Sequence, residues 1–247
     1  MIFLENQTAR LRGIYMLRPL KKLTHRLGQA YVQAVTRSEF LAQTGTRRAN
    51  ERPIEYRYVF QSVSQNCPRT ILDVGTGLSA LPSLMHTCGP VVTAIDNIRD
   101  YWPTGMVNRH FHIKDEDASR SISGMYDMIT CISVLEHVKS CDDAVRCMLS
   151  ALNPGGHLVV TFPYNESQYI PNVYALAGAG YGKDLPYVAQ VYSRREMDRW
   201  FAGVTIVNQE YWRVWSGEFW TFGDALRPPV QTTKEEVHQL MCATVRR

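Results

Sequence analysis

The stretch TILDVGTG at residues 70–77 decides the fold of this 247-residue chain. Its short apolar run ends in two glycines, which is typical of a buried parallel strand that turns directly into a helix. Gly75 and Gly77 allow a sharp turn and a close approach to a ligand, because glycine has no Cβ. Asp96 ends the next predicted strand, where a carboxylate is able to accept hydrogen bonds from both hydroxyls of a ribose. The pattern therefore predicts a nucleotide-like ligand at this turn.

Strands and helices alternate through the centre of the chain. Further strands are predicted at 91–96, 110–114, 126–133 and 157–162, with helices over about 78–86 and from Val145 to the break at Asn153-Pro154-Gly155-Gly156. Strands that are separated by helices are joined as parallel βαβ units. The centre of the chain is therefore predicted to be one α/β domain.

The pattern changes after Pro163. Residues 164–190 are rich in Tyr, Gly and Pro and have no clear period. We interpret them as an insertion or lid, with Gly178, Gly180 and Gly182 as hinges. The alternative is a disordered crossover.

The C-terminal part is predicted to begin with a helix over 193–201. A strand over 204–215 then turns into a partner over 219–222, and Pro228 and Pro229 end the region. The aromatic residues of this predicted hairpin are expected to pack on one another. Thr233 and Glu236 form a T-x-x-E capping box, which predicts a short C-terminal helix.

The N-terminal region is basic. Residues 1–57 hold eleven Lys and Arg against four Asp and Glu, although the whole chain has a net charge of only +4. Leu20, Leu23, Leu27 and Tyr31 recur at helical spacing and predict an amphipathic helix. We therefore divide the chain into a basic helical extension, 1–57, and a domain, 58–247. The apolar stripe is expected to contact either the domain or a second copy of the chain, which would make a homodimer.

Composition excludes several classes of protein. No apolar run approaches the roughly 18–20 residues that a membrane helix needs. Charged residues, among them Glu5 and Arg10, interrupt any signal-peptide core, so a cytoplasmic location is predicted. The six cysteines show no C-x-x-C spacing and no Cys/His cluster. They are expected to be reduced thiols, and no metal is predicted.

Asp73, next to the glycine turn, bears on the kind of ligand. The spacing G-x-G-x-x-A from Gly75 to Ala80 also fits a dinucleotide site. A carboxylate would oppose the pyrophosphate of a dinucleotide, whereas it suits S-adenosylmethionine, which has an ammonium and a sulfonium and no phosphate. The alternative for Asp73 is a residue that merely stabilises the turn.

The chain resembles the class I S-adenosylmethionine-dependent methyltransferases, and is similar in pattern to small-molecule O-methyltransferases of the ubiquinone-biosynthesis type. Five segments match in the family's order: ILDVGTG at 71–77, VVTAID at 91–96, DEDA at 115–118, YDMITCISVLEHV at 126–138 and LNPGGHLVVTFP at 152–163. The resemblance implies a doubly wound, mostly parallel seven-stranded Rossmann-like sheet whose last strand is antiparallel. It also implies methyl transfer from the cofactor S-adenosylmethionine to an oxygen or nitrogen of a small-molecule, sugar or natural-product acceptor.

The resemblance further implies where the cofactor contacts this chain. The methionine part of the cofactor would be surrounded by Asp73, Gly75, Thr76 and Gly77. The ribose would be bound by Asp96 with Asn97, and the adenine by Asp117 and Ala118. Ile132 and Ser133 would form the wall of the pocket. Ser79 stands where the family commonly has a third glycine.

The acceptor side is predicted at two places. His137 follows the strand over 126–133 and is a candidate general base, because imidazole takes up a proton near neutral pH. Its alternative is local packing. Tyr164 and Asn165 follow the strand over 157–162, at the sheet edge where ligands bind in such folds. They are candidate acceptor contacts, with ordinary loop residues as the alternative.

Other functions stay open at this level. The basic arm is compatible with a nucleic-acid or protein methyltransferase. Nucleic acid is not the expected acceptor, because ISVLEH at 132–137 differs from the Pro-Pro-Tyr type that acts on base amines. A dinucleotide-dependent oxidoreductase fits the glycines alone, and a non-catalytic cofactor-binding partner subunit fits the same fold.

Overall fold

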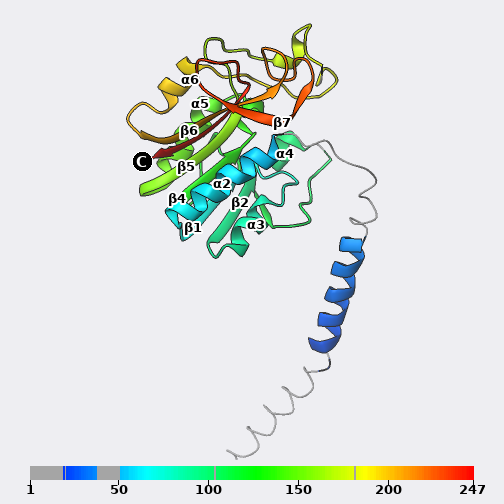
Figure 1. Ribbon diagram of the computed structural model, residues 1–247. Helices are drawn as coiled ribbons and strands as arrows, with labels where there is room; N and C mark the ends of the chain where they lie inside the picture. The colour runs from blue at the N-terminus through cyan, green and yellow to red at the C-terminus, as the bar shows by residue number, and fades with distance from the viewer. Residues whose placement is uncertain (1–18, 20, 38–50, 103, 181) are drawn as a thin grey trace, which may run out of the picture. The chain divides into compact units, whose positions relative to one another are not determined.

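The computed structural model describes residues 19, 21–37, 51–102, 104–180 and 182–247 (Figure 1). The chain divides into two compact units, Met1–Arg48 and Ala49–Arg247. In the first unit the described residues form a helix over 21–37, where an amphipathic helix was predicted. Leu23, Leu27 and Tyr31 of the predicted stripe are exposed.

The second unit is built on one eight-stranded sheet with the order β3-β2-β1-β4-β5-β8-β6-β7. Its elements in chain order are α2 (Arg52–Asn66), β1 (Thr70–Val74), α3 (Leu81–Thr87), β2 (Val91–Asp96), α4 (Ile98–Tyr101), β3 (Ile113–Asp115), β4 (Tyr126–Ile132), η1 (Leu135–His137), α5 (Cys141–Ser150), β5 (Leu152–Pro163), η2 (Val173–Ala175), α6 (Arg194–Trp200), β6 (Thr205–Trp215), β7 (Ala225–Thr232) and β8 (Leu240–Arg246). β1 to β5 pair in parallel, and β8 runs antiparallel between β5 and β6.

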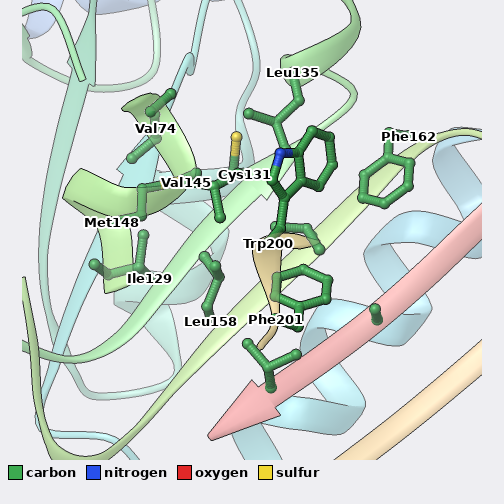
Figure 2. Packing of buried hydrophobic residues seen from close by; sticks show 14 of the residues in the cluster. Val74, Ile129, Cys131, Leu135, Val145, Met148, Leu158, Phe162, Trp200 and Phe201 are labelled. Carbon is green, nitrogen blue, oxygen red and sulfur yellow. The ribbon is translucent and has the colours of Figure 1, made fainter. Parts of the chain in front are cut away.

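Helices cover both faces of the sheet, as a doubly wound fold requires. Successive residues of a strand point to opposite faces, so Ile71 of β1 packs in the cluster with α2 and α3, and Leu72 packs in the cluster with α5 and α6. Figure 2 shows the second cluster, where Trp200 of α6 lies beside Leu135 and Phe162. The predicted fold class is therefore confirmed.

The C-terminal third differs from the prediction. The sheet has eight strands rather than seven, because β7 adds an outer strand to β6. Pro228 and Pro229 lie inside β7 instead of ending the region, which an edge strand tolerates because one side of it needs no hydrogen-bond donors. Phe219 lies in a bend, and Phe222 makes only an isolated bridge to Ala179 rather than a strand.

The predicted C-terminal helix is wrong. The T-x-x-E contact does form, since Glu236 accepts a hydrogen bond from the Thr233 amide, but the chain turns there and continues into β8. Nearly every residue of β8 is buried because the strand is covered on both faces. It therefore lacks the alternation by which a half-buried strand is recognised in sequence.

Residues 164–180 and 182–190 are packed against the rest of the unit. Ile170, Val173, Tyr174, Ala189 and Val191 form a third buried cluster. Its glycines make room for aromatic rings, because a Cβ on Gly178 would lie 2.6 Å from Phe222 and one on Gly182 would lie 2.2 Å from Tyr174. This gives the predicted hinges a packing role.

α2 crosses the boundary that we placed after residue 57 and belongs entirely to the sheet-bearing unit. Within the ranges that the structure describes, no helix is long and apolar enough to cross a membrane.

Candidate active site

The glycine turn after β1 adopts the conformation that its sequence requires. Gly75 and Gly77 have φ values of +70° and +53°, in the left-handed region that favours glycine. A Cβ on Gly75 would lie only 2.3 Å from Cγ1 of Val134, so the turn approaches the exit of β4 closely. The Gly77 amide donates a hydrogen bond of 2.7 Å to Oδ2 of Asp96. The predicted turn and the predicted ribose carboxylate therefore face each other.

Asp96 retains capacity for further donors. Its Oδ1 accepts a hydrogen bond of 3.1 Å from the indole of Trp102, and the backbone of Asn97 also bonds the carboxylate, which leaves about one of its roughly four acceptor positions. Burial raises the pKa of Asp96, against the lowering effect of these hydrogen bonds. Asn97 caps α4 by accepting from the Asp100 amide, which fixes the chain directly after the carboxylate.

Asp73 connects the turn to the neighbouring strand. It is almost fully buried, and its two oxygens accept from the hydroxyls of Thr76, at 2.7 Å, and Thr130, at 2.6 Å. Burial raises the pKa of Asp73 to about 6. The described contacts of Asp73 are thus internal, and they hold Thr76 and the glycine turn against β4.

The predicted adenine region lies beyond the end of β3. Asp117 accepts hydrogen bonds from the amide and the hydroxyl of Ser119, at 2.9 and 2.7 Å, and Ala118 packs against the cluster of α5 and α6. The Tyr101 hydroxyl donates to the carbonyl of His137 at 2.9 Å. This bond joins α4 to the loop after β4 and brings the cofactor side and the predicted base together.

The exit of β4 is held by a carboxylate that sequence reasoning missed. Ser133 follows Ile132, and its hydroxyl donates to Glu55 of α2. Glu55 is fully buried, accepts a hydrogen bond of 2.6 Å from Thr161, and pairs with Arg52 at 2.9 Å. The available signal was a glutamate on the apolar face of α2, among residues that include Ile54 and Tyr58.

His137 lies in η1, directly after this exit. Its Nδ1 is 2.7 Å from the carbonyl oxygen of Val188, so Nδ1 carries the proton and Nε2 is left as an acceptor. Its ring meets Tyr187 edge to face, with centroids 4.7 Å apart. Burial lowers the pKa of His137. The neutral imidazole therefore has its basic nitrogen available at neutral pH, as a general base needs.

Glu136 is a buried carboxyl beside the histidine. Its Oε1 lies 3.9 Å from Nε2 of His137, and its Oε2 has no hydrogen-bond partner among the residues that the structure describes. Burial raises the pKa of Glu136 to about 8. Protonation is therefore favoured more strongly in the folded chain than in the unfolded one.

Glu136→Gln is expected to stabilise the protein at alkaline pH. Between about pH 4.5 and pH 8 the folded state binds a proton at Glu136 that the unfolded state releases, so this group lowers stability as pH rises. The melting temperature of the variant should exceed that of the wild type by about 5 °C at pH 8.5, and by little at pH 5. Glu166→Gln is the control, since the pKa of Glu166 is lowered beside Arg194 and the sign should reverse. Equal differences at both pH values for Glu136→Gln would contradict the assignment.

Tyr164 and Asn165 are accounted for by internal contacts. The Tyr164 ring is fully buried and stacks on His238, and its hydroxyl donates to Glu166 at 2.9 Å. Asn165 Oδ1 accepts from the amides of Ser167 and Gln168, both at 3.1 Å, as in an Asx turn. Both side chains are engaged inside the protein, and their role as acceptor contacts stays a prediction.

A row of rings extends from η1 to the start of α2. Tyr187 lies between His137 and Tyr174, and Tyr174 in turn lies 5.8 Å from Trp220 between centroids. The Trp220 indole donates to Glu51 at 2.8 Å. Residues 164–180 and 182–190, together with the turn at 216–223, thus cover the edge of the sheet at which His137 lies, and we call them the cap.

The site as a whole occupies the carboxyl edge of the sheet, where the strand order reverses between β1 and β4. Ligands of open α/β sheets bind at such a switch point. Asp73, Asp96, Ser133 and His137 all belong to this edge. Among the described residues, no group of three or more His, Cys, Asp or Glu side chains is placed to hold a metal ion.

Comparison with known proteins identifies the family of the chain. A family model described as a methyltransferase domain matches residues 29–207. The ubiquinone biosynthesis O-methyltransferase of Vibrio parahaemolyticus is 28% identical over 136 residues, which are 51% of this chain and 57% of that protein. The protein of the same name from Alkalilimnicola ehrlichii is 29% identical over 162 residues, covering 60% and 64%. The chain therefore spans less than two thirds of the length of these relatives.

The fold is also found among solved structures. The 1,6-didemethyltoxoflavin-N1-methyltransferase of Burkholderia thailandensis, solved with 1,6-didemethyltoxoflavin and S-adenosylhomocysteine, superposes with a TM-score of 0.51. The two chains are 18% identical over 87% of this chain and 88% of that one. At this identity the likeness concerns the fold alone.

Proposed function

The chain belongs to the methyltransferase domain family, and we propose that it transfers the methyl group of S-adenosylmethionine to an oxygen or nitrogen of a small-molecule acceptor. The proposal rests on the placement of the glycine turn against Asp96, whose carboxylate accepts a hydrogen bond of 2.7 Å from the Gly77 amide. A carboxylate with a free acceptor position beside a left-handed glycine turn suits the hydroxyls of a ribose.

The residues of the site fit the cofactor. A Cβ at position 75 would collide with Val134, so only glycine allows the turn to lie this close to the exit of β4. The internal bonds of Asp73 hold that turn in place. When bound, S-adenosylmethionine supplies a methyl group on a sulfonium, which is a good leaving group. We propose that Asp96 and Asn97 orient the ribose, and that Ile132 and Ser133 form the adjoining wall.

His137 is the proposed base. The Val188 carbonyl holds the proton on Nδ1, so Nε2 is oriented to accept the proton of an acceptor hydroxyl or amine as the new bond to carbon forms. The cap and η1 exclude water and hold the acceptor in line, which is the larger part of catalysis for a reaction with a good leaving group. The names of the O-methyltransferase relatives support an oxygen acceptor.

We also propose a cytoplasmic location and a small-molecule acceptor rather than nucleic acid. All six cysteines are free thiols, which suits a reducing compartment. A homodimer formed through the predicted apolar stripe of the helix over 21–37 is also proposed. Light scattering of the whole chain tests that assembly.

Calorimetric titration tests the cofactor. The wild type is expected to bind S-adenosylmethionine and S-adenosylhomocysteine and not NAD, and Asp96→Ala should weaken both by about 100-fold, because it removes charged hydrogen bonds to the ribose. Asp127→Ala is the matched control, since Asp127 accepts backbone hydrogen bonds at the opposite end of β4. Failure of the wild type to bind either sulfur nucleotide, or a preference for NAD, would overturn the proposed function.

A further inference from the structure

Side chains at the start of α2 make hydrogen bonds to the loop after the glycine turn, to the exit of β4 and to the cap. The Tyr56 hydroxyl lies 2.8 Å from Oγ of Ser79, in the loop after the glycine turn. Glu55 bonds Ser133 at the exit of β4. Glu51 accepts from Trp220 of the cap. One helical turn, which precedes the sheet in sequence, thus connects the glycine turn, the β4 exit and the cap.

Glu55 is the buried member of this turn. Its side chain is fully inaccessible to solvent, and three side chains donate to it: those of Ser133, Thr161 and Arg52. A carboxylate at such depth is costly unless it is paired and hydrogen-bonded. Arg52 provides the pairing charge and also donates to the carbonyl of Ile132 at 3.4 Å. The ion pair therefore bonds both residues of the proposed pocket wall.

Ser133 has a conformation that needs support. Its φ is +50°, in the left-handed region where residues with a Cβ are strained. Three contacts hold it there: its amide donates to the carbonyl and to the hydroxyl of Thr161, at 3.0 and 3.1 Å, and its hydroxyl donates to Glu55. Thr161 also donates to Glu55, so the carboxylate connects the ends of β4 and β5.

We infer that Glu55 is a positioning residue that holds Ser133 in its left-handed conformation, and thereby sets the wall of the cofactor pocket at the exit of β4. The inference rests on the proposed function, because Ser133 lies in the proposed pocket. Glu55 itself touches no reacting atom in this assignment; it acts through Ser133.

The test compares two buried carboxylates that both pair with an arginine of α2. Glu55→Met removes the acceptor of Ser133 at similar side-chain volume. Glu210→Met is the matched control, because Glu210 of β6 is also buried and pairs with Arg57 of α2 away from the site. Affinity for S-adenosylhomocysteine is measured on the whole chain. Glu55→Met is expected to weaken it about tenfold, and Glu210→Met less than about twofold.

Ser133→Gly separates positioning from general stability. Glycine adopts the left-handed conformation without support, so Glu55→Met should have little effect on affinity in a Ser133→Gly background. Equal losses in Glu55→Met and Glu210→Met, or no recovery with glycine, would overturn the inference. If Glu55→Met does not fold, Ser133→Ala against Ser133→Gly decides: the inference expects weaker binding for alanine only, and equal affinities reject it. Wild-type protein that does not bind S-adenosylhomocysteine would instead reject the proposed function.

Discussion

His137→Ala is expected to lower turnover by about 10²- to 10⁴-fold and to leave the affinity for S-adenosylhomocysteine unchanged. We propose that the imidazole lies on the acceptor side. Its Nδ1 is held by the Val188 carbonyl, so removing the ring takes away the proposed base without disturbing Asp96 or the glycine turn. The measurement is the transfer of labelled methyl to a panel of hydroxyl- and amine-bearing small molecules, followed for any acceptor on which the wild type turns over.

The pH profile distinguishes a base from a packing residue. Burial lowers the pKa of His137, so the wild-type rate should rise with pH through a pKa below that of ordinary histidine, roughly 6.5, and reach a plateau above it. In His137→Ala this rise of the rate with pH should be absent. His86→Ala is the control, because His86 also bonds a carbonyl, that of Pro90, through Nδ1 at 3.1 Å. Full turnover of His137→Ala would show that the base has been wrongly assigned.

Gly75→Ala is expected to destabilise the sheet-bearing unit by about 2–5 kcal/mol and to abolish binding of S-adenosylhomocysteine. The left-handed conformation costs a residue with a Cβ about 1–2 kcal/mol, and the new atom would lie 2.3 Å from Val134, which adds an overpacking cost of about 1–3 kcal/mol. Thermal unfolding, with and without S-adenosylhomocysteine, measures both effects.

Gly203→Ala isolates the clash from the backbone strain. Gly203 has a φ of +86°, and a Cβ there would have no heavy atom within 4 Å. This control should be destabilised only by the backbone strain, and it should keep its affinity for S-adenosylhomocysteine. Equal destabilisation and unchanged binding in the two variants would show that the close approach of Gly75 to Val134 has no effect on the site.

Motifs that lie within one strand and one turn were predicted correctly. TILDVG predicts a buried strand before a turn, because apolar residues and glycine each favour a particular local conformation. Asp96 ends its strand where the prediction placed it. The C-terminal region was harder. β8 belongs to the centre of the sheet although it comes last in the chain, and its uniform burial removes the periodic signal.

The roles of single side chains depended on distant partners. His137 owes its tautomer to Val188, 51 positions away, and Ser133 owes its conformation to Glu55, 78 positions away. Tyr164 follows a strand at the ligand-binding edge, yet its ring is turned into the interior against His238. Position along a strand indicates the edge of the sheet, whereas the direction of a side chain is determined by packing.

The sequence by itself determined the α/β class, the glycine turn and the carboxylate opposite it, because each depends on residues that are close along the chain or on the repeating order of strands and helices. Only the tertiary structure decided that Glu55 supports the exit of β4, that the imidazole of His137 presents Nε2, and that an eighth strand extends the sheet. These features depend on the burial of charge and on hydrogen bonds between segments far apart in the chain, which no local pattern encodes.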